Sequence, residues 1–179
     1  LGITSLRDGL LILEKTRHVT DEDFKKWTRR VKPQGDDIVF SYETRLGQAA
    51  IIPEGLQCCL GRRMGLVRII RDNVLPEFFL YQYLSPVYRK FLDSQTVRGA
   101  TVNRIPLKKF PSFPLFVPSI PTQQKIVDKL KLISGDSQCL ESTYQRKLIA
   151  LAELKQSLLQ KAFSGELTAD VSTKKEAVA

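Results

Sequence analysis

The chain has 179 residues, 42% of them hydrophobic, which is enough for one sizeable core but little for two full domains. Its net charge of +9 favours a polyanionic partner, most often nucleic acid, although surplus charge can also serve solubility alone. No apolar run approaches the roughly 18 residues of a membrane span, and no signal-peptide pattern opens the chain, so we expect a cytoplasmic protein without membrane contact.

The positive charge is concentrated in the first part of the chain. Residues 1–110 hold 19 Lys and Arg against 12 Asp and Glu, a surplus of 7, whereas residues 111–179 hold 9 against 7, a surplus of 2. The globular part is therefore the better candidate for contacts with phosphates.

The three cysteines fit neither a disulfide framework nor a zinc site. Cys58 and Cys59 are adjacent, and Cys139 stands alone in a helical stretch. We expect them to be small buried apolar residues in a reducing compartment.

The N-terminal stretch LGITSLRDGLLILE looks like mid-domain sequence that starts at Leu1 rather than Met, so we expect further residues upstream. The segment VTDEDFKKWTRR predicts a helix with Thr20 as its N-cap. Asp21, Glu22 and Asp23 then fall in the first turn, where carboxylates are favoured. Consecutive carboxylates on a helix point in different directions, which argues against a metal site.

Short β-rich pieces fill residues 37–70: DIVFSY, AAIIP, LQCCLG and MGLVRII. They predict a compact sheet with tight turns. Pro76 opens a helical stretch that restarts at Ser85 and Pro86. Its aromatic residues could stack on nucleic-acid bases or pack in the core. Helical spacing puts most of them on one face, which favours core packing. These aromatic residues are Phe78, Phe79, Tyr81, Tyr83, Tyr88 and Phe91.

A proline-rich connector precedes the last helix. Its prolines predict an extended joint between domain and helix, which we favour over a ligand for an SH3-type domain. They are Pro111, Pro114, Pro118 and Pro121.

A long helix is predicted from about Ser119 to Phe163. Alternate steps of four and three from Ile126 give ten positions, eight of them apolar, which is typical of a coiled-coil seam. A helix of about 40 residues spans roughly 60 Å, so we expect this seam to meet another long helix. Lys161 and Gly165 mark its end. The apolar seam positions are Ile126, Leu130, Ile133, Leu140, Tyr144, Leu151, Leu154 and Leu158.

These patterns predict an α+β fold. We expect a small α/β globular domain at residues 1–118, one long coiled-coil-type helix at residues 119–164 and a flexible tail at residues 165–179.

No catalytic pattern stands out in the sequence. His18 is the only histidine, and the sequence has no phosphate-binding loop, glycine-rich cofactor fingerprint or adenine-methylation motif. We expect a protein that recognises its partner without being an enzyme, and that needs neither metal nor cofactor.

Three turns carry the candidates for DNA contact. CLGRRMG presents arginines between glycines, where they can reach guanine edges or hold phosphates, although a surface salt bridge is the plain alternative. SYETRLGQ and VRGATVNR combine arginine with side chains able to pair with base edges, yet such residues are also ordinary turn formers. Basic residues near the first helix suit backbone contacts or a solvated helix face. The candidates are Arg62, Arg63, Thr44, Arg45, Gln48, Arg98, Thr101, Asn103, Arg104, Lys25, Lys26, Arg29, Arg30 and Lys32.

Two phrases together resemble a known family. FPLFVPSIPTQQKIVDKL, followed by LESTYQRKLIALAELKQSLLQKAFSGEL, is similar to the end of a target recognition domain and its adjoining helix in specificity subunits of type I restriction-modification systems. The stretch GDDIVFSYETRLGQAAIIPEGLQCCLGRRMGLVRI also looks like such a domain.

The resemblance implies a protein that reads one half of a bipartite site in double-stranded DNA and directs methyltransferase subunits, and through them the restriction subunit, to it. Similar proteins carry two recognition domains and two long antiparallel helices, whereas this chain carries one of each. It is therefore expected to be a half-size subunit that pairs through its helix with a second copy or a different recognition subunit, or a fragment of a longer one.

Two alternatives remain open at this point. The first alternative is the recognition module of a fused restriction-methyltransferase, and the second is a coiled-coil interaction protein with incidental basic charge. The bases recognised and the orientation of helix pairing do not follow from the sequence.

Overall fold

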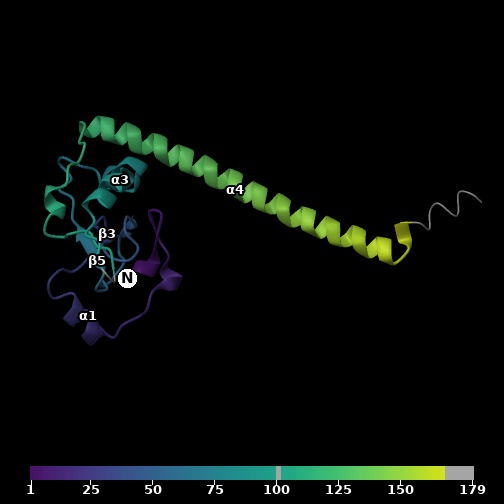
Figure 1. Cartoon of the computed structure of the whole chain (residues 1–179), viewed down its shortest axis with the longest axis horizontal. Helices are drawn as coiled ribbons and strands as arrows, with labels where there is room; N and C mark the ends of the chain where they lie inside the picture. The colour runs from purple at the N-terminus through teal and green to yellow at the C-terminus, as the bar shows by residue number, and fades with distance from the viewer. Residues whose placement is uncertain (100–101, 168–179) are drawn as a thin grey trace, which may run out of the picture. The chain divides into compact units, whose positions relative to one another are not determined.

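The computed structural model describes residues 1–99 and 102–167. They form two compact units, Leu1–Asp128 and a second that begins at Lys129, and each is described by itself. Figure 1 shows a small sheet domain and a long C-terminal helix, which confirms the predicted α+β class. The strands are β1 (Leu6–Arg7), β2 (Leu10–Leu11), β3 (Ile38–Ser41), β4 (Ala49–Ile51) and β5 (Met64–Val67). The helices are α1 (Asp21–Trp27), α2 (Pro76–Leu84), α3 (Pro86–Gln95) and α4 (Ile120–Phe163), with 3-10 turns at Ile3–Ser5, Leu13–Lys15 and Phe110–Ser112.

A three-stranded antiparallel sheet in the order β4-β3-β5 is the centre of the first unit. Its register pairs Ile38 with Val67 at one end of β3 and Ser41 with Met64 at the other. All four residues of β3 are buried, so the sheet is covered on both faces. A second, two-stranded sheet joins β1 to β2.

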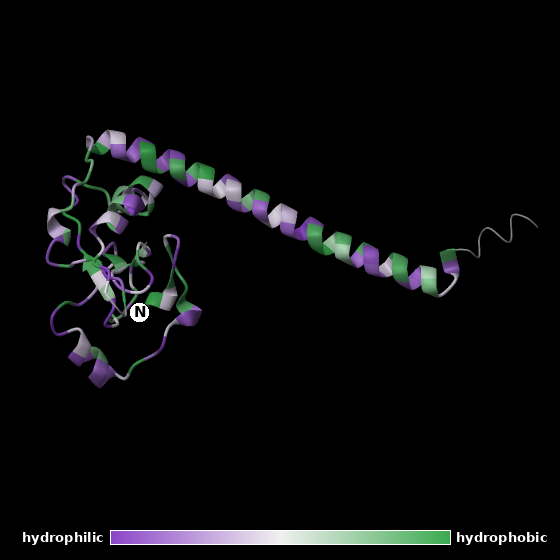
Figure 2. Ribbon diagram, viewed as in Figure 1, coloured by the Kyte–Doolittle hydropathy of each residue, from purple (hydrophilic) through white to green (hydrophobic). Residues whose placement is uncertain are grey.

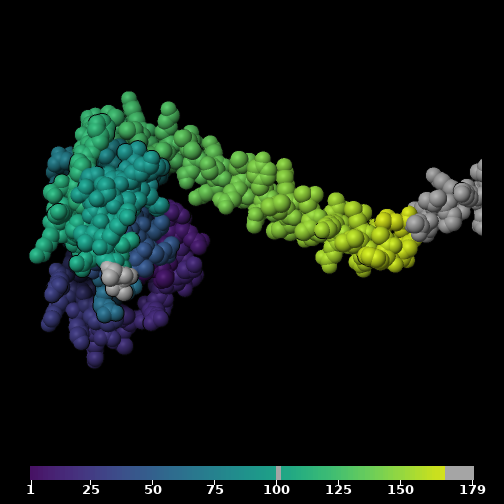
Figure 3. Space-filling model, in the orientation of Figure 1, coloured from purple at the N-terminus to yellow at the C-terminus, as the bar shows by residue number. Residues whose placement is uncertain are grey.

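Alternate residues of β3 belong to two different hydrophobic clusters. Ile38 and Phe40 pack with Phe79 and Tyr83 of α2, with Tyr88 of α3 and with Ile105. Val39 packs on the other face, with Leu6 and Cys58. In Figure 3 the first forty residues gather on one side of this unit, and α3 and the segment after it gather on the other.

The predicted core role is confirmed for most of the aromatic residues of α2 and α3: Phe78, Phe79, Tyr83 and Tyr88 are buried, and Phe91 packs partly against the first cluster, whereas Tyr81 is half-exposed. Tyr83 is fully buried between Phe40, Phe79 and Tyr88, with ring centroids about 6 Å apart. Gly65 in β5 makes room for the Phe40 ring, because a Cβ atom there would lie 2.4 Å from it.

Several local predictions are confirmed by hydrogen bonds. The Thr20 hydroxyl accepts from the Asp23 amide at 3.2 Å and caps α1. The Ser85 hydroxyl accepts from the Tyr88 amide at 3.2 Å, and Pro86 starts α3. Each cap uses an amide that its helix leaves unpaired.

Three local predictions are wrong. Residues 56–61 form no strand; they cover one face of the sheet as an irregular segment, with Cys58 buried there. Helix α1 ends at Trp27, so Arg29 and Arg30 lie beyond it. Cys139 is exposed, unlike the other two cysteines.

The first turns of α4 belong to the first unit. Gln123 is fully buried; its Oε1 accepts from the Leu75 amide at 2.9 Å, and its Nε2 donates to the carbonyls of Asn73 at 2.9 Å and Pro118 at 2.7 Å. Val127, one turn later, is also buried. The helix start is thus anchored by hydrogen bonds and by apolar packing.

The remainder of α4 carries an exposed apolar stripe, visible as recurring hydrophobic bands along the helix in Figure 2. Gly165 follows the helix with a φ of 80°, as the sequence predicts for a C-terminal cap. In the described part of the chain, no helix is long and apolar enough to cross a membrane. An apolar groove near the helix end is lined by Leu151, Leu154, Lys155, Leu158, Leu159, Ala162 and Leu167.

Candidate nucleic-acid interface

Two of the predicted turns lie side by side at one end of the central sheet. The register that pairs Ser41 with Met64 places the turn 61–63, just before β5, next to the residues that follow β3. The Tyr42 amide donates to the Arg63 carbonyl at 3.2 Å, and the Tyr42 hydroxyl donates to the Arg62 carbonyl. Both arginine side chains are exposed beside this contact.

The third predicted turn pairs with the same segment that follows β3. Glu43 forms an isolated antiparallel bridge with Arg104, and Val97 forms another with the same residue. The Ile105 amide donates to the Tyr42 carbonyl at 2.8 Å. The segments 42–48, 61–63 and 97–104, which are far apart in the sequence, therefore converge on one surface. We call this surface the arginine cluster.

Thr44 occupies a strained position at the tip of the first segment. Its φ is 68°, which is unusual for a β-branched residue. The Arg45 amide donates to the Glu43 carbonyl at 2.8 Å across it, which makes a tight three-residue turn. The Thr44 amide donates to the Asn103 carbonyl at 3.4 Å, so the third segment helps to hold this turn.

The predicted side chains in the arginine cluster differ in how they are engaged. Arg45 Nη1 donates to the Ile3 carbonyl at 3.2 Å. Gln48 accepts from the Asp8 amide at 2.7 Å, so it ties the cluster to the N-terminal turn. Arg98, Asn103 and Arg104 are exposed, and Thr101 lies outside the described residues.

The charge of the arginine cluster is strongly one-sided. Its three segments contain five arginines and a single carboxylate, Glu43, which lies 3.4 Å from Arg63 Nε. Such a surface attracts the phosphates of a nucleic acid. Sequence reasoning passed over Glu43, although its place between Tyr42 and Thr44 in the same turn could have drawn attention to it.

A second basic group lies toward the opposite end of β3. Lys25 and Lys26 are on α1, whereas Arg29, Arg30 and Lys32 lie on the segment that leads to Asp37. From the sequence, all five were predicted either to contact the DNA backbone or to form one solvated helix face. The structure places only the first two on the helix.

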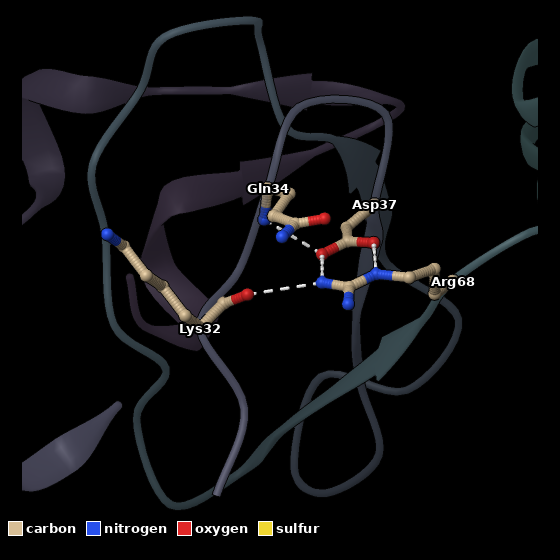
Figure 4. Close-up of polar contacts among 4 residues, drawn as sticks. All are labelled: Lys32, Gln34, Asp37 and Arg68. Atoms are coloured by element: carbon tan, nitrogen blue, oxygen red, sulfur yellow. Dashed lines mark hydrogen bonds and ion pairs between the residues drawn. The ribbon is translucent and has the colours of Figure 1, made fainter. Parts of the chain in front are cut away.

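An ion pair fixes the end of this basic segment (Figure 4). Both Asp37 oxygens accept from Arg68, each at 2.7 Å, and Arg68 also donates to the Lys32 carbonyl at 3.1 Å. The Gln34 amide donates to the same carboxylate at 2.8 Å. Hydrogen bonding to Asp37 raises the pKa of Arg68, so the guanidinium stays charged.

The described residues contain no group of three or more His, Cys, Asp and Glu side chains that could hold a metal ion. The arrangement suits recognition: hydrogen-bond donors and charge are displayed on turns that a packed sheet supports.

Comparison with known proteins identifies a family. The sequence profile of the type I restriction modification DNA specificity domain matches residues 13–146. The chain is 27% identical to the type I restriction enzyme EcoBI specificity subunit of Escherichia coli over 171 residues, which are 94% of this chain and 35% of that subunit.

Solved structures show the same likeness. A chain from a study of complex assembly and conformational transition of the type I R-M system matches with a TM-score of 0.59 and 26% identity, over 73% of this chain and 31% of that one. The HsdS subunit from Thermoanaerobacter tengcongensis matches in fold, with a TM-score of 0.55 and 20% identity, over 75% of this chain and 34% of that one. The chain thus spans about a third of the length of these relatives.

Proposed function

The chain belongs to the family of type I restriction modification DNA specificity domains, and from this we propose that it reads one half of a bipartite site in double-stranded DNA. The observation that carries the proposal is the convergence of three arginine-bearing turns on one surface. Arginine pairs bidentately with guanine or holds phosphates, so one surface can supply both base recognition and affinity.

The residues that we propose for DNA contact divide into two groups. The arginine cluster, with Arg62 and Arg63 at its centre, is the proposed base-reading surface. The group around α1 is proposed to hold the DNA backbone, because its exposed lysines and arginines supply positive charge that attracts phosphates. Its members are Lys25, Lys26, Arg29, Arg30 and Lys32.

The chemistry is proposed to lie in other subunits. In this proposal the chain is a cytoplasmic, non-catalytic subunit that directs adenine methyltransferase subunits, and through them an endonuclease, to the half-site. The exposed apolar stripe of α4 supports pairing with another long helix, either that of a second copy or that of a different recognition subunit. Two identical copies would produce a two-fold arrangement and a palindromic, gapped site.

Adenine-methylation sequencing tests the proposal in cells that carry the cognate methyltransferase, with and without this chain. A palindromic, gapped motif that depends on the chain is expected for two identical copies, and an asymmetric motif for pairing with a different recognition subunit. Methylation that is the same in both cultures would contradict the proposed role and leave a basic interaction protein as the better account.

A further inference from the structure

Glu43 is the one carboxylate in the segments of the arginine cluster, and its backbone is held by several contacts. Its carbonyl accepts from the Ser41 hydroxyl at 2.9 Å and from the Arg45 amide at 2.8 Å, and its backbone forms the bridge with Arg104. Its side chain is 27% exposed and lies beside Arg63. The fold therefore fixes the backbone that carries this carboxylate, and Arg63 is the charged partner of the side chain.

A carboxylate at this place opposes simple phosphate binding. It repels the phosphate charge, and phosphate oxygens have no hydrogen to donate to it. The groups on DNA that can satisfy a carboxylate are the amino groups of bases, and in the major groove the cytosine N4 amino group is the usual partner of Glu. A DNA complex that buries Glu43 is thus favoured when the carboxylate meets a base.

Arg63 supplies the complementary half of such a contact. Its Nε faces Glu43 Oε2 at 3.4 Å, and the side chain is 48% exposed. Its two terminal nitrogens make no hydrogen bond to any residue in the ranges 1–99 and 102–167, so they can donate to the O6 and N7 atoms of guanine. The donors of Arg63 and the acceptor of Glu43 lie side by side. That order matches the acceptors of guanine beside the amino donor of its paired cytosine.

We propose that Glu43 and Arg63 together read one G·C base pair in the major groove, with Arg63 donating to guanine and Glu43 accepting from the N4 amino group of cytosine. Glu43 is then a specificity-determining residue as well as the partner that orients Arg63 before DNA arrives. It also lowers affinity for DNA that lacks this base pair, because the carboxylate is left facing phosphates or unpaired groups. This inference rests on the proposed DNA-reading function.

The substitution Glu43→Gln tests the inference in the full chain, with adenine-methylation sequencing in cells that carry the cognate methyltransferase. Glutamine keeps the size of the side chain and removes its charge. We expect a G·C pair in the half-site of the unmodified chain. The variant should lose about tenfold of its discrimination at that one position, as a lost base contact of this kind predicts, and keep the others.

Glu54→Gln is the matched control, because it changes the net charge equally. Glu54 is exposed in the turn after β4, and the preceding Ile51 pairs with Ile38 at the other end of the sheet. This variant should leave the motif unchanged. If Glu43→Gln also leaves every position unchanged, the inference is wrong while the proposed function stands. If the unmodified chain directs no motif, the proposed function itself fails.

A binding measurement covers the case in which Glu43→Gln abolishes methylation. Fluorescence anisotropy with a labelled random-sequence duplex compares the purified full-length chain with both variants. We expect Glu43→Gln to bind random DNA about threefold more tightly, because removal of the carboxylate relieves repulsion at the contact surface, and Glu54→Gln to change little. Equal or weaker binding by Glu43→Gln would overturn the inference.

Discussion

Tyr83 lies at the centre of the aromatic core with a hydroxyl that finds no hydrogen-bond partner among the described residues. Burial raises the pKa of its phenol above the usual value of about 10. In the unfolded chain the phenol ionises near pH 10, whereas in the folded unit it stays protonated. Below about pH 10 the phenol is protonated in both states and leaves the free energy of unfolding unchanged. As the pH rises further the free energy of unfolding falls, because unfolding then releases a proton.

Tyr83→Phe should stabilise the domain by about 1 kcal/mol near neutral pH, because it removes a buried hydroxyl without a partner. It should also remove the loss of stability that this phenol causes above about pH 10. Urea unfolding followed by near-ultraviolet circular dichroism measures both effects. Tyr81→Phe, on the same helix but only half-buried, is the control and should change the unfolding free energy by less than about 0.5 kcal/mol. A destabilised Tyr83→Phe variant would show that the hydroxyl has a partner.

Single-residue predictions from the sequence succeed where the cause is local. Thr20 and Ser85 cap helices because their hydroxyls reach amides three residues later, and that spacing is visible in the sequence. The strain at Thr44 has no such local signal. Its turn is held in part by the carbonyl of Asn103, which only the folded chain brings near.

In helix α4, the adjacent residues Gln123 and Gln124 differ in the same way between contacts to distant segments and local contacts. Gln123 makes three hydrogen bonds to segments outside α4. Gln124 is exposed, and within residues 1–99 and 102–167 its side chain donates only to Asp128, one turn along the same helix. The same residue type therefore anchors the helix at one position and lies on its solvated face at the next.

Gln123→Ala should destabilise the first unit by about 3 kcal/mol, because it leaves the Leu75 amide and two carbonyls without their partner. Gln124→Ala should cost less than about 0.5 kcal/mol. Chemical denaturation of both variants gives the comparison. Similar stability of the two would mean that solvent or a neighbouring group replaces the Gln123 contacts.

Element predictions fail where apolar residues cover a core without forming regular structure. Residues 56–61 carry the apolar character of a buried strand, but they pack over β3 as an irregular segment. Helix ends are also weakly encoded: the basic residues after Trp27 are compatible with a longer helix, yet α1 stops there. Long periodic segments are easier, and α4 begins within a residue of its predicted start.

For the whole molecule, the apolar stripe of α4 predicts self-association or pairing with another helix. Replacing Leu140 and Leu151 together with Asp should abolish that association, because two charges would enter an apolar seam. Light scattering of the full-length chain measures the change in mass.

Leu132→Asp is the control for this double substitution. Leu132 is 66% exposed, close to the 57% of Leu140 and the 61% of Leu151, but it lies off the seam. It should leave the mass unchanged. A mass that is unaffected by Leu140→Asp and Leu151→Asp would contradict pairing through this stripe.

The convergence of the three turns at one end of the sheet could not be predicted from the sequence. Each turn is recognisable alone, but its neighbours are set by the antiparallel register of β3 with β5 and by the bridges of Arg104. These contacts join residues about 20 and 60 positions apart, which local patterns do not encode.

The placement of the arginine cluster beyond the strand ends separates two kinds of mutational change. The buried side chains that pack the sheet come from its strands, from α2 and α3 and from the irregular segment 56–61, whereas the arginines of the cluster lie on turns that follow or precede the strands. If the arginine cluster contacts DNA as proposed, substitutions at the exposed Arg62 or Asn103 should alter what is bound while the folding free energy changes little. In that case a lineage of such domains explores new targets through a few exposed positions and still inherits the same core.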